Sequence, residues 1–91
     1  MHEDGYRVTL APGALRDLNQ LPPRAAAAVI EFIAHVLPDN PRRVGKPLRQ
    51  GFEGLYSARR GDYRVLYDII PSDRVILVIR VDHRAKAYRR R

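Results

Sequence analysis

The second half of the chain carries side chains that could together bind RNA and cleave it without a metal ion. Such a reaction needs groups that activate a 2′-OH, protonate the leaving 5′-oxygen and stabilise the extra negative charge of the phosphorane. Arginine supplies positive charge and paired donors, histidine and lysine transfer protons, and tyrosine stacks on a base or orients the nucleophile. The candidates for these tasks are Lys46, Arg59, Arg64, Arg80, His83, Arg84 and Tyr88.

Two strand-like runs must position several of these side chains. Residues 63–70 and 75–82 both alternate with period two and keep one set of positions wholly apolar. The turn residues Pro71, Ser72 and Asp73 join them into an antiparallel pair. With the apolar sets on one face, the predicted facing pairs are Tyr63 with Val81, Val65 with Ile79, Tyr67 with Leu77 and Arg64 with Arg80.

A second predicted hairpin adds a third strand and a third arginine. Gly61 suits the first central position of a type II′ turn, which requires a positive φ. Counting back from this turn makes Arg59 a cross-strand neighbour of Arg64. The three strands then present a basic stripe of Arg59, Arg64 and Arg80. Each arginine alone is also what an exposed sheet face carries for solubility, but the cluster indicates an anionic ligand.

Charge is distributed unevenly along the chain. The formal net charge is +7, yet residues 1–45 hold five basic and five acidic groups, so the whole excess lies in residues 46–91. Lys86 and Arg89 extend the basic character to the C-terminal run and are expected to contact phosphates. A basic sheet face with a basic tail is typical of proteins that bind a polyanion, most often nucleic acid. A GC-rich genome explains the preference for arginine over lysine but not this segregation.

Length and composition limit the remaining possibilities. Ninety-one residues suit one domain, 1–91, with one core. The sequence has no cysteine, which leaves no disulfide framework or thiolate metal site, and we expect neither a metal nor a cofactor. It shows no long apolar run and no signal core, so the expected location is the cytoplasm.

The first half of the chain predicts one strand and two helices. Residues 6–11 alternate, residues 12–21 space leucines on one helical face, and residues 24–37 form an alanine-rich amphipathic helix before Pro38. Residues 38–47 read as an exposed loop. The fold class is therefore α+β with the order β-α-α-β-β-β. We expect an antiparallel sheet with a helical hairpin packed on one face, and the first strand beside the last.

Three segments resemble the RelE/ParE superfamily of bacterial toxins, and most closely its RelE branch. They are KPLR at 46–49, GLYSARRGDYRVLYDI at 54–69 and VILVIRVDHRAKAYR at 75–89. The resemblance covers nearly the whole chain. It implies a ribosome-dependent endonuclease that cleaves mRNA, held as a hetero-oligomer by a RelB-like antitoxin that also represses the operon.

The resemblance also implies roles for particular residues. Arg64 matches the arginine of the Tyr-Arg strand motif, Arg84 the second family arginine, and Tyr88 the C-terminal tyrosine. The family's strand lysines are absent, and Lys46 stands where some relatives place a glutamate before the Pro-Leu motif. The general base therefore stays open between Lys46 and His83.

Alternatives remain for the whole protein and for single residues. A ParE-like poison that binds gyrase would share the fold without nuclease activity, and a plain nucleic-acid-binding module would not be toxic. His83 also suits an ordinary exposed strand end, and Tyr88 a packing residue. The basic face combined with the His-Arg and Tyr ending favours RNA cleavage.

Overall fold

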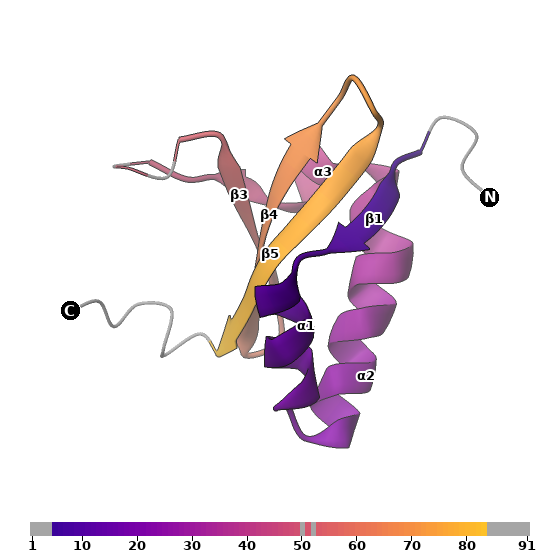
Figure 1. Ribbon diagram of the computed structural model, residues 1–91, viewed down its shortest axis with the longest axis vertical. Helices are drawn as coiled ribbons and strands as arrows, with labels where there is room; N and C mark the ends of the chain where they lie inside the picture. Colours follow the sequence, from indigo (N-terminus) through magenta and orange to yellow (C-terminus); the bar gives the residue numbers. More distant parts are fainter. Residues whose placement is uncertain (1–4, 50, 52, 84–91) are drawn as a thin grey trace.

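The computed structural model describes residues 5–49, 51 and 53–83 (Figure 1). The element order confirms the predicted α+β class. The described elements are β1 (Arg7–Leu10), α1 (Pro12–Asn19), α2 (Pro23–Glu31), the π-helical turn η1 (Phe32–Val36), the 3-10 turn η2 (Leu37–Asp39), α3 (Pro41–Val44), β2 (Lys46–Pro47), β3 (Leu55–Arg60), β4 (Tyr63–Ile70) and β5 (Val75–His83).

Proline opens α1, α2 and α3, at Pro12, Pro23 and Pro41. This position suits proline because its φ is already helical and the missing N–H would have had no partner within the helix. The predicted helix 24–37 is interrupted, since α2 ends at Glu31 and the chain continues through η1 and η2. Pro38 thus lies inside η2 instead of closing an α-helix.

The predicted exposed loop 38–47 is wrong. It contains α3 and the strand β2, and Pro38, Pro41 and Gly45 within it are buried. A four-residue helix and a two-residue strand are too short to produce a periodic pattern. The prolines and the glycine, which are typical of loops, are therefore the strongest signals in this segment. The segment instead forms one side of the candidate site.

The described strands form a sheet in the order β1-β5-β4-β3-β2. β1 lies beside the last strand as expected, but it runs parallel to β5, so the prediction of a wholly antiparallel sheet is wrong in this detail. The remaining pairs are antiparallel. A parallel pair requires a long crossover connection, which the helices and the other strands provide here.

The β3–β4 register agrees with the prediction, because a tight turn fixes it. Arg59 faces Arg64, and Gly61 has a φ of +63°. Arg74 is the one described non-glycine residue with a positive φ, so the φ of Asp62 is negative. A positive φ at Gly61 followed by a negative φ at Asp62 is the pattern of a type II′ turn.

The β4–β5 register differs from the prediction. Tyr67 faces Val78, a shift of one residue, and an irregularity between Leu66 and Tyr67 adds another, so Arg64 faces Asp82 and not Arg80. The intervening turn places Arg74 at a φ of 54°, and the first half of β5 is apolar on both faces. Neither the turn nor the apolar pattern could therefore fix this register from sequence.

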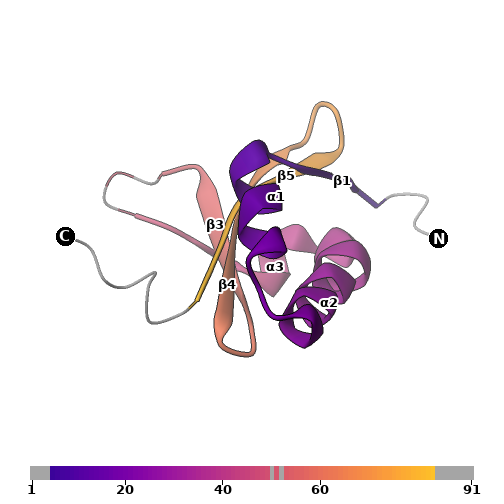
Figure 2. The same cartoon turned by 60° about the horizontal axis from the view of Figure 1, so that its bottom comes forward.

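The core lies between the helices and one face of the sheet, and α1 and α2 are grouped on one side of β3, β4 and β5 (Figures 1 and 2). Its buried members come from both layers: Ala14, Leu18, Val29, Phe32, Ile33, Leu37, Ala58, Val65, Tyr67, Ile76, Val78 and Val81. This arrangement confirms the predicted packing of the helical hairpin. In the part of the chain that the structure describes, no helix is long and apolar enough to cross a membrane.

Candidate RNA-binding groove

A groove of about 530 Å³ lies where β2, β3 and β4 meet. It brings together Lys46, Arg59 and Arg64, three of the side chains singled out by sequence. No carboxylate is among its described lining residues, which are Val44, Lys46, Pro47, Leu48, Ser57, Ala58, Arg59 and Arg64. We call this surface the basic groove.

Cross-strand pairing places the three basic side chains on the face away from the helices. Arg59 faces Arg64, and Lys46 faces Ser57, whose side chain points to the same side as that of Arg59. Their strand neighbours Ala58 and Val65 are buried on the helix side. Arg64 is half-buried and its Nε atom is inaccessible to solvent. The Arg64 guanidinium is therefore partly enclosed by its neighbours.

Lys46 enters the groove because α3 and β2 are anchored to the sheet. The Tyr67 hydroxyl donates a buried hydrogen bond of 2.6 Å to the carbonyl oxygen of Pro41. Burial raises the pKa of Tyr67 to about 12, so the hydroxyl keeps its proton at neutral pH. On the far side of Lys46, the Leu48 N–H donates to the Leu55 carbonyl at 2.9 Å. Lys46 therefore sits between two fixed points.

Arg80 lies outside the basic groove and is bound to α1. Its Nε and Nη2 atoms donate to the two carboxylate oxygens of Asp17 at 2.7 and 3.2 Å. A second, longer ion pair joins Arg80 to Asp82 at 3.6 Å. The guanidinium already has carboxylate partners, so the structure does not assemble the predicted stripe of Arg59, Arg64 and Arg80 as one phosphate-binding set.

Asp17 also satisfies the edge of β5 beyond the end of β1. Its Oδ2 atom accepts the Val81 N–H at 2.8 Å, a donor that would otherwise face an open strand edge. Burial alone would raise the pKa of Asp17, but the hydrogen bonds from Arg80 and Val81 and the charges of Arg80 and Arg16 outweigh it and lower the pKa below 3.8. We call Asp17, Arg80, Val81 and Asp82 the α1–β5 seam.

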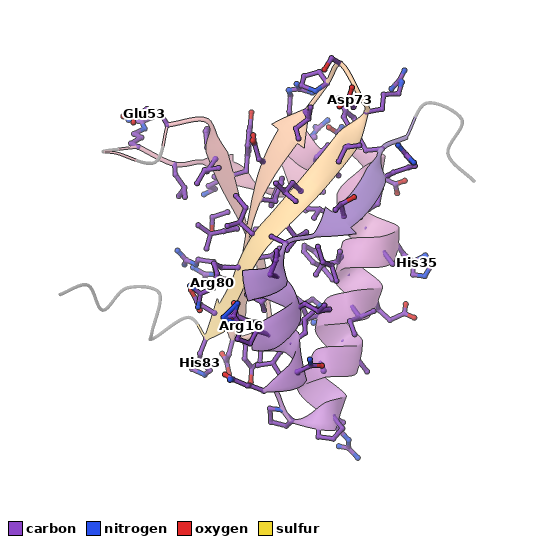
Figure 3. All side chains as sticks on the ribbon, viewed as in Figure 1. Arg16, His35, Glu53, Asp73, Arg80 and His83 are labelled. Carbon is purple, nitrogen blue, oxygen red and sulfur yellow. The ribbon has the colours of Figure 1, made fainter. Side chains whose placement is uncertain are left out.

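His83 is not brought to the basic groove. It faces Tyr63, and the two rings meet edge to face with centroids 5.3 Å apart. Since Asp82 faces Arg64, the adjacent His83 points to the opposite face of the sheet. Figure 3 shows His83 at the end of β5 close to α1, and with Arg80 it lines a smaller pocket of about 280 Å³ next to the α1–β5 seam.

Four candidates lie outside the described residues: Arg84, Lys86, Tyr88 and Arg89. The roles given to them on the basis of sequence stay predictions. Among residues 5–49, 51 and 53–83, no three His, Cys, Asp or Glu side chains are grouped closely enough to hold a metal ion.

The sequence reading missed Asp17, Gly45 and Tyr67 as determinants of the site. Asp17 bonds to Arg80 across 63 positions of sequence, a separation at which no spacing rule applies. Alternation places Tyr67 on the apolar face, in agreement with its burial, but nothing in the pattern indicates a partner for its hydroxyl. Gly45 lies between α3 and β2, inside the segment that the sequence predicts to be a loop.

Comparison with known proteins places this geometry in a family. The sequence profile described as ParE toxin of type II toxin-antitoxin system, parDE, matches residues 8–88. Toxin RelG of Mycobacterium tuberculosis is 52% identical over 85 residues, covering 93% of this chain and 98% of that protein. Toxin RelE of the same organism is 48% identical over 84 residues, covering 92% and 87%.

Solved structures agree with the sequence relatives. The toxin–antitoxin complex RelBE2 of M. tuberculosis contains a chain that is 50% identical, with a TM-score of 0.85 and coverage of 88% of this chain and 99% of that one. An Escherichia coli RelE toxin variant, 22% identical with a TM-score of 0.73 and coverage of 92% and 87%, shares the fold. The chain therefore belongs to the RelE/ParE superfamily of type II toxins and is a RelE-like toxin.

Proposed function

We propose that this chain is an endoribonuclease that cleaves mRNA on the ribosome, through attack of a 2′-OH on the adjacent phosphate and without a metal ion. The observation that carries the proposal is the basic groove, which gathers Lys46, Arg59 and Arg64 from three strands with no carboxylate in its described lining. Because the mRNA is cleaved on the ribosome, the proposed action takes place in the cytoplasm.

Within the groove the three basic side chains have distinct tasks. Arg64, half-buried with an inaccessible Nε, donates to the phosphate oxygens as negative charge develops on them, and Arg59 assists from the facing strand. Losing one such donor costs on the order of 2.7–4 kcal/mol of transition-state stabilisation. Lys46 donates a proton to the leaving 5′-oxygen, and the proton lost by the attacking 2′-OH passes to solvent water. Arg84 and Tyr88 complete the proposed site by binding phosphate and orienting the nucleophile.

The primary test is induction in a bacterial host followed by primer extension on a test mRNA. We expect discrete cuts that appear only when the mRNA is translated, and no cuts with the Arg64→Ala variant. A gyrase poison is the second candidate, favoured by the ParE description of the matching family profile. Intact mRNA together with cleaved DNA would establish that function instead.

We further propose that a RelB-like antitoxin normally binds this chain. The RelBE2 structure of the 50% identical relative is a toxin–antitoxin complex. A formal net charge of +7 suits an acidic or amphipathic partner segment, which would also stabilise the small fold by binding only the folded state. Purification from the native host should recover a second, smaller protein. Consistent recovery of the lone chain from cells that make the neighbouring gene product would contradict this proposal.

A further inference from the structure

We propose that Tyr67 is a positioning residue that sets the place of Lys46 in the basic groove through its hydroxyl group. The inference builds on the RNA cleavage proposed above, because it concerns how one side chain of that site is held. Tyr67 itself is fully buried and lies on the helix side of the sheet, whereas Arg64 lies on the groove side. Its hydroxyl therefore acts without touching RNA.

The hydroxyl contacts the chain at both ends of α3. It donates to the carbonyl oxygen of Pro41, the first residue of that helix, at 2.6 Å. Gly45, the residue directly after the helix, packs against the same hydroxyl oxygen. Lys46 is the next residue along the chain, so one buried group fixes the backbone immediately before it.

The packing of Gly45 shows how closely this part of the chain approaches the sheet. A methyl group at Gly45 would overlap the Tyr67 Oη atom and lie 2.9 Å from the Ser57 carbonyl oxygen. The Gly45 φ of −113° is open to any residue, so glycine is required here for space and not for backbone conformation. Ser57 is also the residue that faces Lys46. Tyr67 and the Ser57 backbone thus define where β2 can lie.

The tyrosine ring is itself fixed, which makes its hydroxyl a rigid reference point. The rings of Tyr56 and Tyr67 stack with centroids 5.6 Å apart and an interplanar angle of 20°. Removal of the hydroxyl alone keeps this stack while releasing the hydrogen bond to Pro41 and the contact with Gly45. A displacement of about 1 Å in a catalytic group is enough to cost about a hundredfold in rate.

The test compares Tyr67→Phe with Tyr63→Phe, a matched control on the same strand whose ring packs on His83. On ribosome-bound mRNA, Tyr67→Phe should lower kcat by about tenfold to a hundredfold with little change in KM, and Tyr63→Phe should leave both unchanged. In the Lys46→Ala background the same Tyr67→Phe change should cost less than about twofold, since two groups that act as one unit are not additive. Equal losses in the two backgrounds would overturn the proposal.

A second readout is independent of activity. The amide hydrogen exchange of Gly45 and Lys46, followed by NMR, should be at least about tenfold faster in Tyr67→Phe and unchanged in Tyr63→Phe. Unchanged exchange in a folded Tyr67→Phe protein would overturn the positioning role even if the chain cleaves mRNA. Faster exchange in a chain that does not cleave mRNA would support the role of Tyr67 while refuting the proposed function.

Discussion

The basic groove and the α1–β5 seam lie on the same sheet and contain arginines on neighbouring strands, but they hold them in opposite ways. In the groove, Arg64 stands beside Arg59 and Lys46 with no carboxylate in the described lining. In the seam, Arg80 is bound by Asp17 at 2.7 Å and reaches Asp82 at 3.6 Å. The groove lining gathers three basic side chains, although Asp82 of the seam is the cross-strand neighbour of Arg64, whereas the seam binds Arg80 to the carboxylate of Asp17.

The difference shows that the position of an arginine on a sheet face does not by itself define its role. Arg80 is more than half exposed and looks available from its strand pattern, yet it joins a helix to a strand edge. Gly13 confirms how tightly α1 approaches there, because a methyl group on it would lie 3.0 Å from the Arg80 Cδ atom. Arg64 is less exposed and lines the basic groove together with Lys46 and Arg59. The carboxylate of Asp17, which α1 brings to Arg80, is what ties that arginine into the seam.

Gly45→Ala should produce the largest change in the free energy of unfolding. It disrupts the groove side of the sheet and leaves the α1–β5 seam intact. The added methyl group meets both Tyr67 Oη and the Ser57 carbonyl oxygen, and overpacking of this kind costs about 3 kcal/mol. Urea unfolding measures the loss. In the Tyr67→Phe background the penalty should shrink, since one of the two clashing groups is gone. A Gly45→Ala protein as stable as the wild type would show that β2 is free to move.

Asp17→Asn disrupts the seam and spares the groove. We expect a loss of about 2 kcal/mol, from charged hydrogen bonds discounted for the exposure of Arg80, and a fall in Tm of about 8–16 °C. Asp82→Asn is the matched control, and its 3.6 Å contact with Arg80 should be worth less than about 1 kcal/mol. Cleavage per folded molecule should stay near the wild-type rate. A large loss of cleavage by folded Asp17→Asn would show that the seam also contributes to cleavage.

The seam should also weaken in acid. The pKa of Asp17 is lowered from 3.8 in the folded protein, so its stabilising contribution is complete above that value and disappears as the pH falls through the folded pKa. The difference in free energy of unfolding between wild type and Asp17→Asn should therefore be constant near neutrality and shrink below pH 3.8. Urea titrations at several pH values test this, and a difference that persists in strong acid would contradict it.

The salt dependence of RNA binding should show the smallest difference between groove and seam variants, and the most selective one. Binding of a single-stranded RNA analogue with 2′-deoxy positions should weaken with salt at about 0.7 log units per log unit of salt for each phosphate neutralised. Arg59→Ala should reduce that slope by about one phosphate, whereas Arg80→Ala should leave it unchanged because Arg80 is already paired. Equal reductions of the salt slope in the two variants would show that RNA contacts both the basic groove and the α1–β5 seam.

The sequence was sufficient for the parts of the fold that local signals control. The Gly61 turn fixed the β3–β4 register, and with it the pairing of Arg59 and Arg64 that the groove depends on. The alternation of β4 also placed Tyr67 in the core and Arg64 on the other face. A tight turn leaves only one register that keeps the apolar side chains buried, which is why this half of the site was predictable.

The other half depends on contacts that have no local signal. β5 carries apolar residues on both faces up to Ile79, the residue left unpaired at the irregularity, so its register could not be read from the pattern. The parallel pairing of β1 and the bond from Asp17 to Arg80 arise only when distant segments meet. Lys46 is a candidate from sequence because of its chemistry, but its position comes from Tyr67 and Gly45.

We propose that the basic groove, and not the α1–β5 seam, carries the chemistry. Single-turnover cleavage of ribosome-bound mRNA by Arg64→Ala and Arg80→Ala, with each protein shown to be folded, tests it most directly. We predict a loss of tenfold to about a thousandfold for Arg64→Ala, because a donor to the transition state is removed, and a change of less than about threefold for Arg80→Ala. A folded Arg64→Ala protein that cleaves at the wild-type rate, or an Arg80→Ala protein that loses as much, would contradict the account.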